Sequence, residues 1–177
     1  MSRTFNLEAL ILKRVNTGET DRVVTLLSRE KGKLVCVAKG VRKLNSSKRA
    51  FMEPGNLVKA HFVQTKSLPL LIQAKLISDS APAKSSLVKI RQLTQVLEVF
   101  DKLFVEEELD FKTFQLAIDT RDQIVGGELK LVKPQLGKLI SLLGFPHPDQ
   151  TKFDSILDYV QQLAERPMRS FEYLQLK

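Results

Sequence analysis

The sequence predicts an α+β protein with two domains: a β-barrel over residues 1–80 and an all-helical domain over residues 81–177. Two observations carry this prediction. Short segments rich in Val, Ile, Leu and Thr, separated by turn residues, fill the first part, which is typical of β-strands. Beyond the polar stretch Ser78–Ser86, apolar residues recur at the spacing of a helix instead. Ser78–Ser86 is therefore the expected domain boundary.

Five strands are expected in the first part. Thr17-Gly18 separates the first two, and Lys31-Gly32 makes a tight hairpin between the second and third. Alternation is clearest in the fourth, where Val58, Ala60 and Phe62 share one face. The expected strands are Leu7–Arg14, Arg22–Arg29, Lys33–Lys39, Leu57–Gln64 and Leu70–Ile77.

One longer excursion, Gly40–Asn56, lies between the third and fourth strands. Five short strands with this gap match the five-stranded OB-fold barrel, which commonly binds nucleic acid on its open face. An SH3-like barrel would give a similar pattern, so alternation leaves both barrels open.

Four main helices are expected in the second part. Asp110 can cap the second, and Pro134 either starts or kinks the third. Apolar spacing places Phe100, Phe104, Phe111 and Phe114 in the core of this domain. The expected helices run over 86–105, from 110 to 126, up to 144 and over 151–164, with a short last helix over 170–176.

The positive charge is confined to the first part. Residues 1–80 hold 15 Lys/Arg against 6 Asp/Glu, whereas residues 81–177 hold 13 against 14. Within the first part, Arg29–Arg49 contains eight basic residues and one acidic residue. Clustering of this kind predicts binding of a polyanion.

The candidate DNA-binding residues fall into three groups. Two residues, Lys31 and Lys33, flank the hairpin glycine. Five line the long excursion: Lys39, Arg42, Lys43, Lys48 and Arg49. Two stand at strand ends, Arg14 and Arg22, and for these the Glu19/Asp21 turn is as good a partner as a phosphate. Phe51 follows the basic run and is the candidate for base stacking. Few other aromatic residues lie in this part, so contacts to phosphate are expected to dominate, with little sequence preference.

Several classes of protein are disfavoured. The single Cys36 cannot form an intrachain disulfide, and one Cys with two distant His residues cannot build a tetrahedral zinc site. No apolar run reaches the roughly 18–20 residues that span a bilayer.

Glu19 and Asp21 are interpreted as turn residues rather than as a catalytic pair, so neither catalysis nor a cofactor is expected. The expected location is the cytoplasm, in association with the nucleoid.

The stretch Gly18–Lys43 resembles the signature of the RecO family of bacterial recombination mediators. The resemblance lies in the acidic turn Glu19-Thr20-Asp21, the hairpin Lys31-Gly32-Lys33 and the run Ala38–Lys43. Two later segments, Leu142–Pro146 and Arg166–Ser170, are also similar to family motifs. The four-cysteine zinc site that many family members carry after the Gly-Phe-Pro segment is missing from this chain.

The resemblance implies a function for both domains. It implies an N-terminal OB-fold, binding of single- and double-stranded DNA, and annealing of complementary strands. It also implies partnership with RecR and with the acidic C-terminal tail of single-stranded DNA-binding protein, with loading of RecA as the indirect result.

A groove for such an acidic, hydrophobic-ended tail requires basic residues around an apolar pocket. Lys130, Lys133 and Lys138, near Leu136 and Leu139, are the candidates. Two alternative functions stay open on the residues alone. One is an RNA- or ribosome-binding OB module, and the other is a protein adaptor whose basic face binds an acidic partner.

Overall fold

The computed structural model describes residues 3–169 and divides the chain into two compact units. The first unit contains Met1–Ser80 together with Val105–Leu109, and the second contains Ala81–Phe104 and Asp110–Lys177. The division after Ser80 lies within the expected boundary. The five residues Val105–Leu109 differ from the expectation, because they pack with the barrel although helical residues surround them in the sequence.

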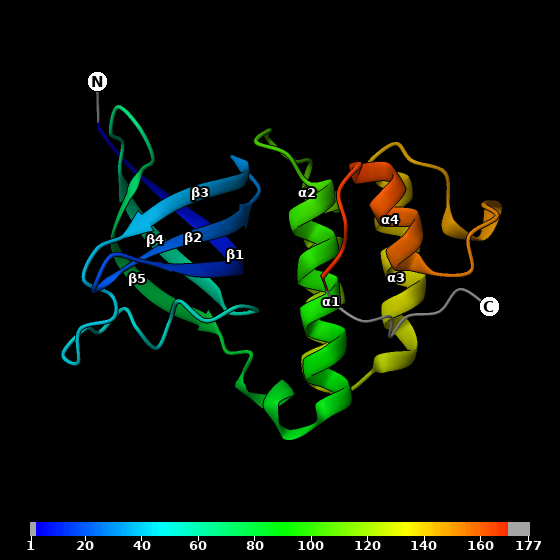
Figure 1. Ribbon diagram of the computed structural model, residues 1–177, viewed down its shortest axis with the longest axis horizontal. Helices are drawn as coiled ribbons and strands as arrows, with labels where there is room; N and C mark the ends of the chain where they lie inside the picture. The colour runs from blue at the N-terminus through cyan, green and yellow to red at the C-terminus, as the bar shows by residue number, and fades with distance from the viewer. Residues whose placement is uncertain (1–2, 170–177) are drawn as a thin grey trace. The chain divides into compact units, whose positions relative to one another are not determined.

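The first unit is a closed five-stranded barrel (Figure 1). Its strands are β1 (Thr4–Thr17), β2 (Asp21–Ser28), β3 (Gly32–Ala38), β4 (Leu57–Val63) and β5 (Leu70–Ser78). They follow the order β1-β2-β3-β5-β4, and β4 returns to pair with β1. All pairs are antiparallel except β3 with β5, which meet in parallel at Val37 and Leu70. The OB-fold prediction is confirmed.

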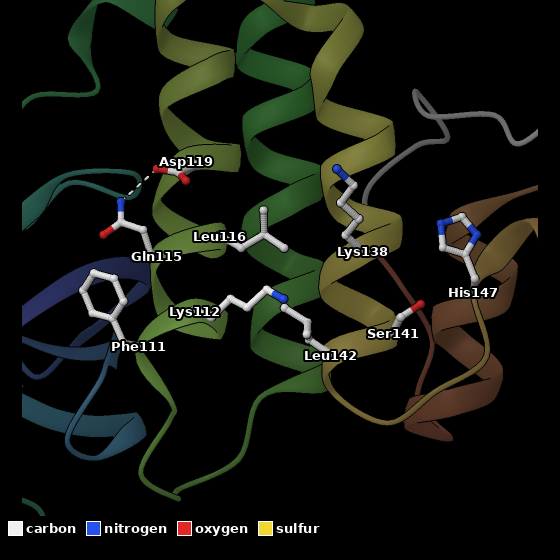
Figure 2. A pocket seen from close by; sticks show the side chains of 9 residues that line it. All are labelled: Phe111, Lys112, Gln115, Leu116, Asp119, Lys138, Ser141, Leu142 and His147. Atoms are coloured by element: carbon white, nitrogen blue, oxygen red, sulfur yellow. Dashed lines mark hydrogen bonds between the residues drawn. The ribbon is translucent and has the colours of Figure 1, made fainter.

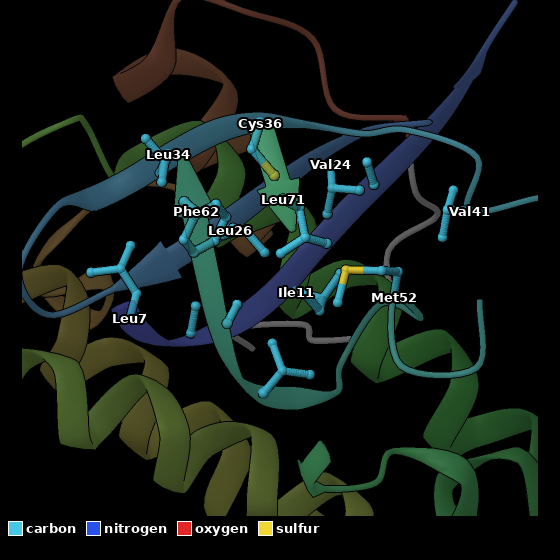
Figure 3. Packing of buried hydrophobic residues seen from close by; sticks show 14 residues of the cluster. Leu7, Ile11, Val24, Leu26, Leu34, Cys36, Val41, Met52, Phe62 and Leu71 are labelled. Carbon is cyan, nitrogen blue, oxygen red and sulfur yellow. The ribbon is translucent and has the colours of Figure 1, made fainter. Parts of the chain in front are cut away.

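Alternate residues of the strands fill the barrel interior, because successive side chains of a strand point to opposite faces (Figure 3). Phe62 is fully buried, and its ring stacks on Phe5 with 5.1 Å between the ring centroids. The first strand is longer than predicted at both ends. Its start pairs with β4, and its end pairs with β2 as far as Thr17 opposite Asp21.

The second unit consists of helices α1 (Leu87–Leu103), α2 (Phe111–Gly126), α3 (Val132–Leu142) and α4 (Ile156–Ala164). Three short 3₁₀ turns accompany them: η1 (Ala81–Ser85), η2 (Leu129–Leu131) and η3 (Pro148–Gln150). Within residues 3–169, no helix is both long and apolar enough to cross a bilayer. Pro134 lies in the first turn of α3, where a missing N–H is tolerated, so it helps to start that helix.

The aromatic core of this unit agrees with the prediction except at one residue. Phe100, Phe104 and Phe114 are buried, and the first two rings meet edge to face. Phe111 was predicted as core, but 64 % of it is exposed. It is the first residue of α2, directly after the Asp110 cap, which accepts a hydrogen bond from the Thr113 N–H.

The fourth helix begins later than predicted. Thr151 does not start it, because its hydroxyl donates to the carbonyl of Pro148 and closes the η3 turn. The helix begins instead after Ser155, whose hydroxyl accepts the Asp158 N–H as an N-cap. The last predicted helix, 170–176, lies outside the described residues.

Asn56 fastens the chain just before β4. Its side-chain oxygen accepts hydrogen bonds from the N–H and the hydroxyl of Ser80, each at 2.8 Å. Its amide nitrogen donates to the carbonyls of Ala50 and Phe51. Asn56 is buried, and without it the Ser80 N–H and the carbonyls of Ala50 and Phe51 would lose these bonds, whereas the Ser80 hydroxyl would keep its bond to the Pro54 carbonyl.

We predict that Asn56→Ala lowers the free energy of unfolding by about 2–3 kcal/mol, because buried backbone groups lose their partners. Urea denaturation followed by far-UV circular dichroism measures the change. Asn45→Ala is the control, since Asn45 is exposed in the same connection, and its effect should stay within about 0.5 kcal/mol. Equal stability of the two variants would contradict the role of Asn56.

Candidate nucleic-acid interface

The connection between β3 and β4, Lys39–Asn56, carries most of the predicted DNA-binding residues, and we call it the basic loop. Its start is hydrogen-bonded to the turn between β1 and β2. The Asp21 carboxylate accepts the Gly40 N–H at 2.7 Å, and the Arg42 N–H donates to the Thr20 carbonyl at 2.9 Å. Gly40 has φ of +63°, a conformation that a glycine adopts without strain.

Two buried apolar side chains anchor the basic loop to the barrel core. Val41 and Met52 are fully buried and belong to the barrel core (Figure 3). The basic side chains just before and between these anchors remain at the surface. Lys39, Lys43 and Arg49 are exposed, while Arg42 and Lys48 are half-buried. The loop is therefore a fixed platform for five positive charges.

Two strand-end arginines adjoin this platform. Arg22 is only 8 % exposed, its Nε donates to the Asn16 side chain, and its Nη1 has no hydrogen-bond partner. Burial lowers the pKa of Arg22, and the positive charges of Arg14, Arg49 and Arg42 lower it further. The positive charges therefore repel one another at this end of the barrel, which favours an approaching anion.

Arg14 and Arg22 were predicted to have either a phosphate or the Glu19/Asp21 turn as partner. Within the described residues, each arginine has an intramolecular partner other than that turn, while contact with phosphate stays a prediction. Arg14 pairs with Glu53 at 3.0 Å, and Arg22 bonds to Asn16. Glu53 is the carboxylate that raises the pKa of Arg22 against its basic neighbours. The interpretation of Asp21 as a turn residue agrees with its bond to Gly40.

Lys31 and Lys33 lie at the other end of the β2–β3 pair. Arg22 is opposite Ala38, and Ser28 is opposite Gly32. About seven residues of strand, at about 3.3 Å each, place the hairpin about 20 Å from the basic loop. The structure thus separates the predicted residues into two groups.

The aromatic residues of the barrel are largely occupied by packing. Phe51 is half-buried against the barrel core, so less of its ring is available for a base than its sequence position indicates. Phe5 stacks on Phe62, and the Lys31 ammonium lies 5.7 Å from its ring centre. His61 bonds to Asn6 at 2.9 Å. This packing favours contacts through phosphate.

A groove lies between α2 and α3 in the helical unit, with a volume of 580 Å³ (Figure 2). Its apolar residues include Phe111 and Leu142, which is 40 % exposed. Lys112 on α2 and Lys138 on α3 add positive charge along it. Asp119, the one carboxylate among the described residues that line the groove, accepts a hydrogen bond from Gln115 at 2.8 Å. Sequence reasoning missed Phe111 here because its spacing fits a core position.

The three predicted groove lysines are placed differently. Lys138 lines the groove, and together with Lys133 and His147 it also lines an adjoining hollow of 370 Å³. Lys130 is exposed on η2 and lines neither. Leu136 and Leu139 are fully buried, so they cannot supply the apolar floor that was predicted from them.

The residues present do not fit a zinc site. Cys36 is buried in the barrel, and burial raises the pKa of its thiol to about 12, which disfavours the thiolate that metals bind. Among residues 3–169, no three His, Cys, Asp or Glu side chains form a group able to hold a metal ion.

Comparison with known proteins agrees with this architecture. The family model described as recombination protein O N terminal matches residues 1–79. The DNA repair protein RecO of Heliobacterium modesticaldum is 35 % identical over 101 residues, 57 % of this chain and 37 % of its own length. That of Shouchella clausii is 31 % identical over 121 residues, covering 68 % and 47 %. That of Salinibacter ruber is 26 % identical over 157 residues, covering 84 % and 60 %.

A closed OB-fold barrel with an anchored basic loop, continued by a helical unit, defines the class of this protein. Within that class, the family-model match and the curated relatives support assignment of the chain to the RecO family of DNA repair proteins. The chain spans about half the length of the curated relatives it matches.

We predict that the hydrogen bond between Asp21 and Gly40 makes stability depend on pH. The Gly40 N–H holds the pKa of Asp21 below its ordinary value of 3.8. A lowered pKa in the folded state contributes stability above pH 3.8, and this contribution is lost as the pH falls through the folded-state pKa. Asp21→Asn should therefore destabilise the protein more at pH 7 than at pH 3. Denaturation of both proteins at the two pH values measures this, and a pH-independent difference would contradict it.

Proposed function

We propose that this protein binds single- and double-stranded DNA through the basic loop and acts as a recombination mediator in DNA repair. The observation that carries the proposal is the fixed platform of five basic side chains beside Arg14 and Arg22. A pinned loop loses little conformational entropy when phosphates bind, and each neutralised phosphate releases counterions. Contacts of this kind read the backbone rather than the bases, which suits a protein that acts on any sequence.

The same charge supports annealing of complementary strands. Two DNA strands repel each other through their phosphates, and a basic surface that neutralises part of that charge lowers the repulsion. Similarity to the RecO family supports the further steps of the proposal. These are partnership with RecR and, indirectly, loading of RecA.

We predict that Lys39→Glu, Lys43→Glu and Arg49→Glu together weaken binding of a 30-nucleotide single strand at least about tenfold at 0.1 M salt. The salt dependence should also flatten, by roughly 0.7 in slope for each lost phosphate contact. Fluorescence anisotropy of labelled DNA across a salt series measures both quantities. All three side chains are exposed, so the fold should stay intact.

The matched control is Lys59→Glu, Lys66→Glu and Lys75→Glu. These three lysines are also exposed in the barrel unit, but they lie outside the basic loop. The control should lose much less affinity although its net charge is the same. Equal losses in the two variants would show that only total charge matters. Stronger binding of RNA than of DNA would favour an RNA-binding module, and weak binding at physiological salt would favour a protein adaptor.

We also propose that the groove between α2 and α3 binds the acidic, hydrophobic-ended tail of single-stranded DNA-binding protein. Phe111 and Leu142 offer an exposed apolar floor, and Lys112 and Lys138 flank it. An apolar end residue would lie on the floor, while the carboxylates of the tail would meet the lysines.

We predict that Phe111→Ala weakens binding of an acidic peptide with a free hydrophobic C-terminal residue by about fivefold or more, as expected for an aromatic anchor. Lys138→Glu should weaken binding to a similar extent, because it replaces a positive charge beside the peptide carboxylates with a negative one. Isothermal titration calorimetry with this peptide measures the affinity. Leu87→Ala is the control, since Leu87 is 60 % exposed and does not line the groove. Unchanged affinity in both groove variants would overturn this assignment.

A further inference from the structure

The segment that connects α1 to α2, Val105–Leu109, lies along the β2–β3 hairpin of the barrel unit, and we call it the acidic strap. Two backbone hydrogen bonds hold it there. The Lys33 N–H donates to the Val105 carbonyl at 2.8 Å, and the Leu109 N–H donates to the Arg29 carbonyl at 2.7 Å. The strap therefore spans the hairpin from one side of its turn to the other.

Gly32 makes this close approach possible. A Cβ atom at this position would collide with the carbonyls of Val105 and Glu107 and would lie 2.8 Å from the Glu107 nitrogen. Gly32 also has φ of +59°, which disfavours any other residue. Gly32 is thus required both for the hairpin turn and for the close contact with the acidic strap.

The strap changes the charge of this end of the barrel. Glu106, Glu107 and Glu108 are consecutive and exposed. The hairpin 29–33 carries three basic residues and one acidic residue, so the three glutamates bring the local formal charge to −1. Adjacent extended segments lie about 5 Å apart, within the Debye length of about 8 Å at physiological salt. Hairpin lysines and strap glutamates therefore act on an approaching phosphate together.

We propose that the acidic strap excludes DNA from Lys31 and Lys33 and confines it to the basic loop at the other end of β2 and β3. This inference rests on the proposed DNA binding and adds to it the residues that limit where DNA can lie. The barrel then has one attractive end and one repulsive end, about 20 Å apart along the strands. The strap glutamates are positioning residues, because they need not contact the DNA.

Neutralising the strap tests the proposal. Glu106→Gln, Glu107→Gln and Glu108→Gln together should raise the affinity for a 30-nucleotide single strand about threefold at 0.1 M salt. The slope of log affinity against log salt should steepen by roughly 1, as phosphates gain contact with the hairpin lysines. Adding Lys31→Gln and Lys33→Gln to this variant should remove both gains. The same lysine changes in the wild-type background should have little effect.

The matched control changes net charge equally elsewhere, with Glu8→Gln, Glu128→Gln and Glu165→Gln, all at exposed positions. It should leave the salt slope unchanged. If the strap variant binds like wild type while the basic-loop variant loses affinity, the strap inference is overturned and the proposed function stands. If the basic-loop variant binds DNA as well as wild type does, the proposed function itself fails.

Discussion

The hydrogen bonds that fix both ends of the basic loop to the barrel are the constraint on which the functional surface depends. Asp21 holds the start through Gly40, and Asn56 holds the end through the carbonyls of Ala50 and Phe51. Five basic side chains between 39 and 49, with no carboxylate among them, would spread apart in a free loop. The barrel opposes that repulsion, and a bound polyanion would relieve it.

The two ends of β2 and β3 differ in the charge that surrounds them. At one end of β2 and β3 the basic loop joins Arg14 and Arg22, with Glu53 as a nearby counter-charge. At the other end the acidic strap offsets the lysines of the hairpin. A chain with a formal net charge of +8 would attract DNA from every side. Under the proposed function, a repulsive end would give that attraction a direction.

The sequence predicts the secondary structure of the barrel well because alternation is a local property. All five strands agree to within about three residues at each end, and the gap between β3 and β4 correctly indicates the OB-fold. Partners that are distant in sequence were not predictable. Neither the pairing of Arg14 with Glu53 nor the packing of Val105–Leu109 on the hairpin leaves a local pattern.

The helical unit shows the same limit. Phe111 fits the spacing of a core residue, but its position at the first turn of α2 turns it to the surface, where it forms part of the groove. Leu136 and Leu139 were assigned to the groove floor because lysines flank them, whereas their actual face is the buried one. Helical periodicity identifies one apolar face, but tertiary packing decides which apolar residues remain uncovered.

The DNA-binding role of the basic loop is tested most directly by lysine footprinting of the full chain with and without saturating single-stranded DNA, in which mass spectrometry measures the acetylation rate of each lysine. If the basic loop binds DNA, the bound strand should slow acetylation of Lys39, Lys43 and Lys48 and leave that of Lys59 and Lys75 unchanged. Protection confined to lysines outside residues 39–49, or spread evenly over all exposed lysines, would contradict the claim that the basic loop is the DNA-binding surface.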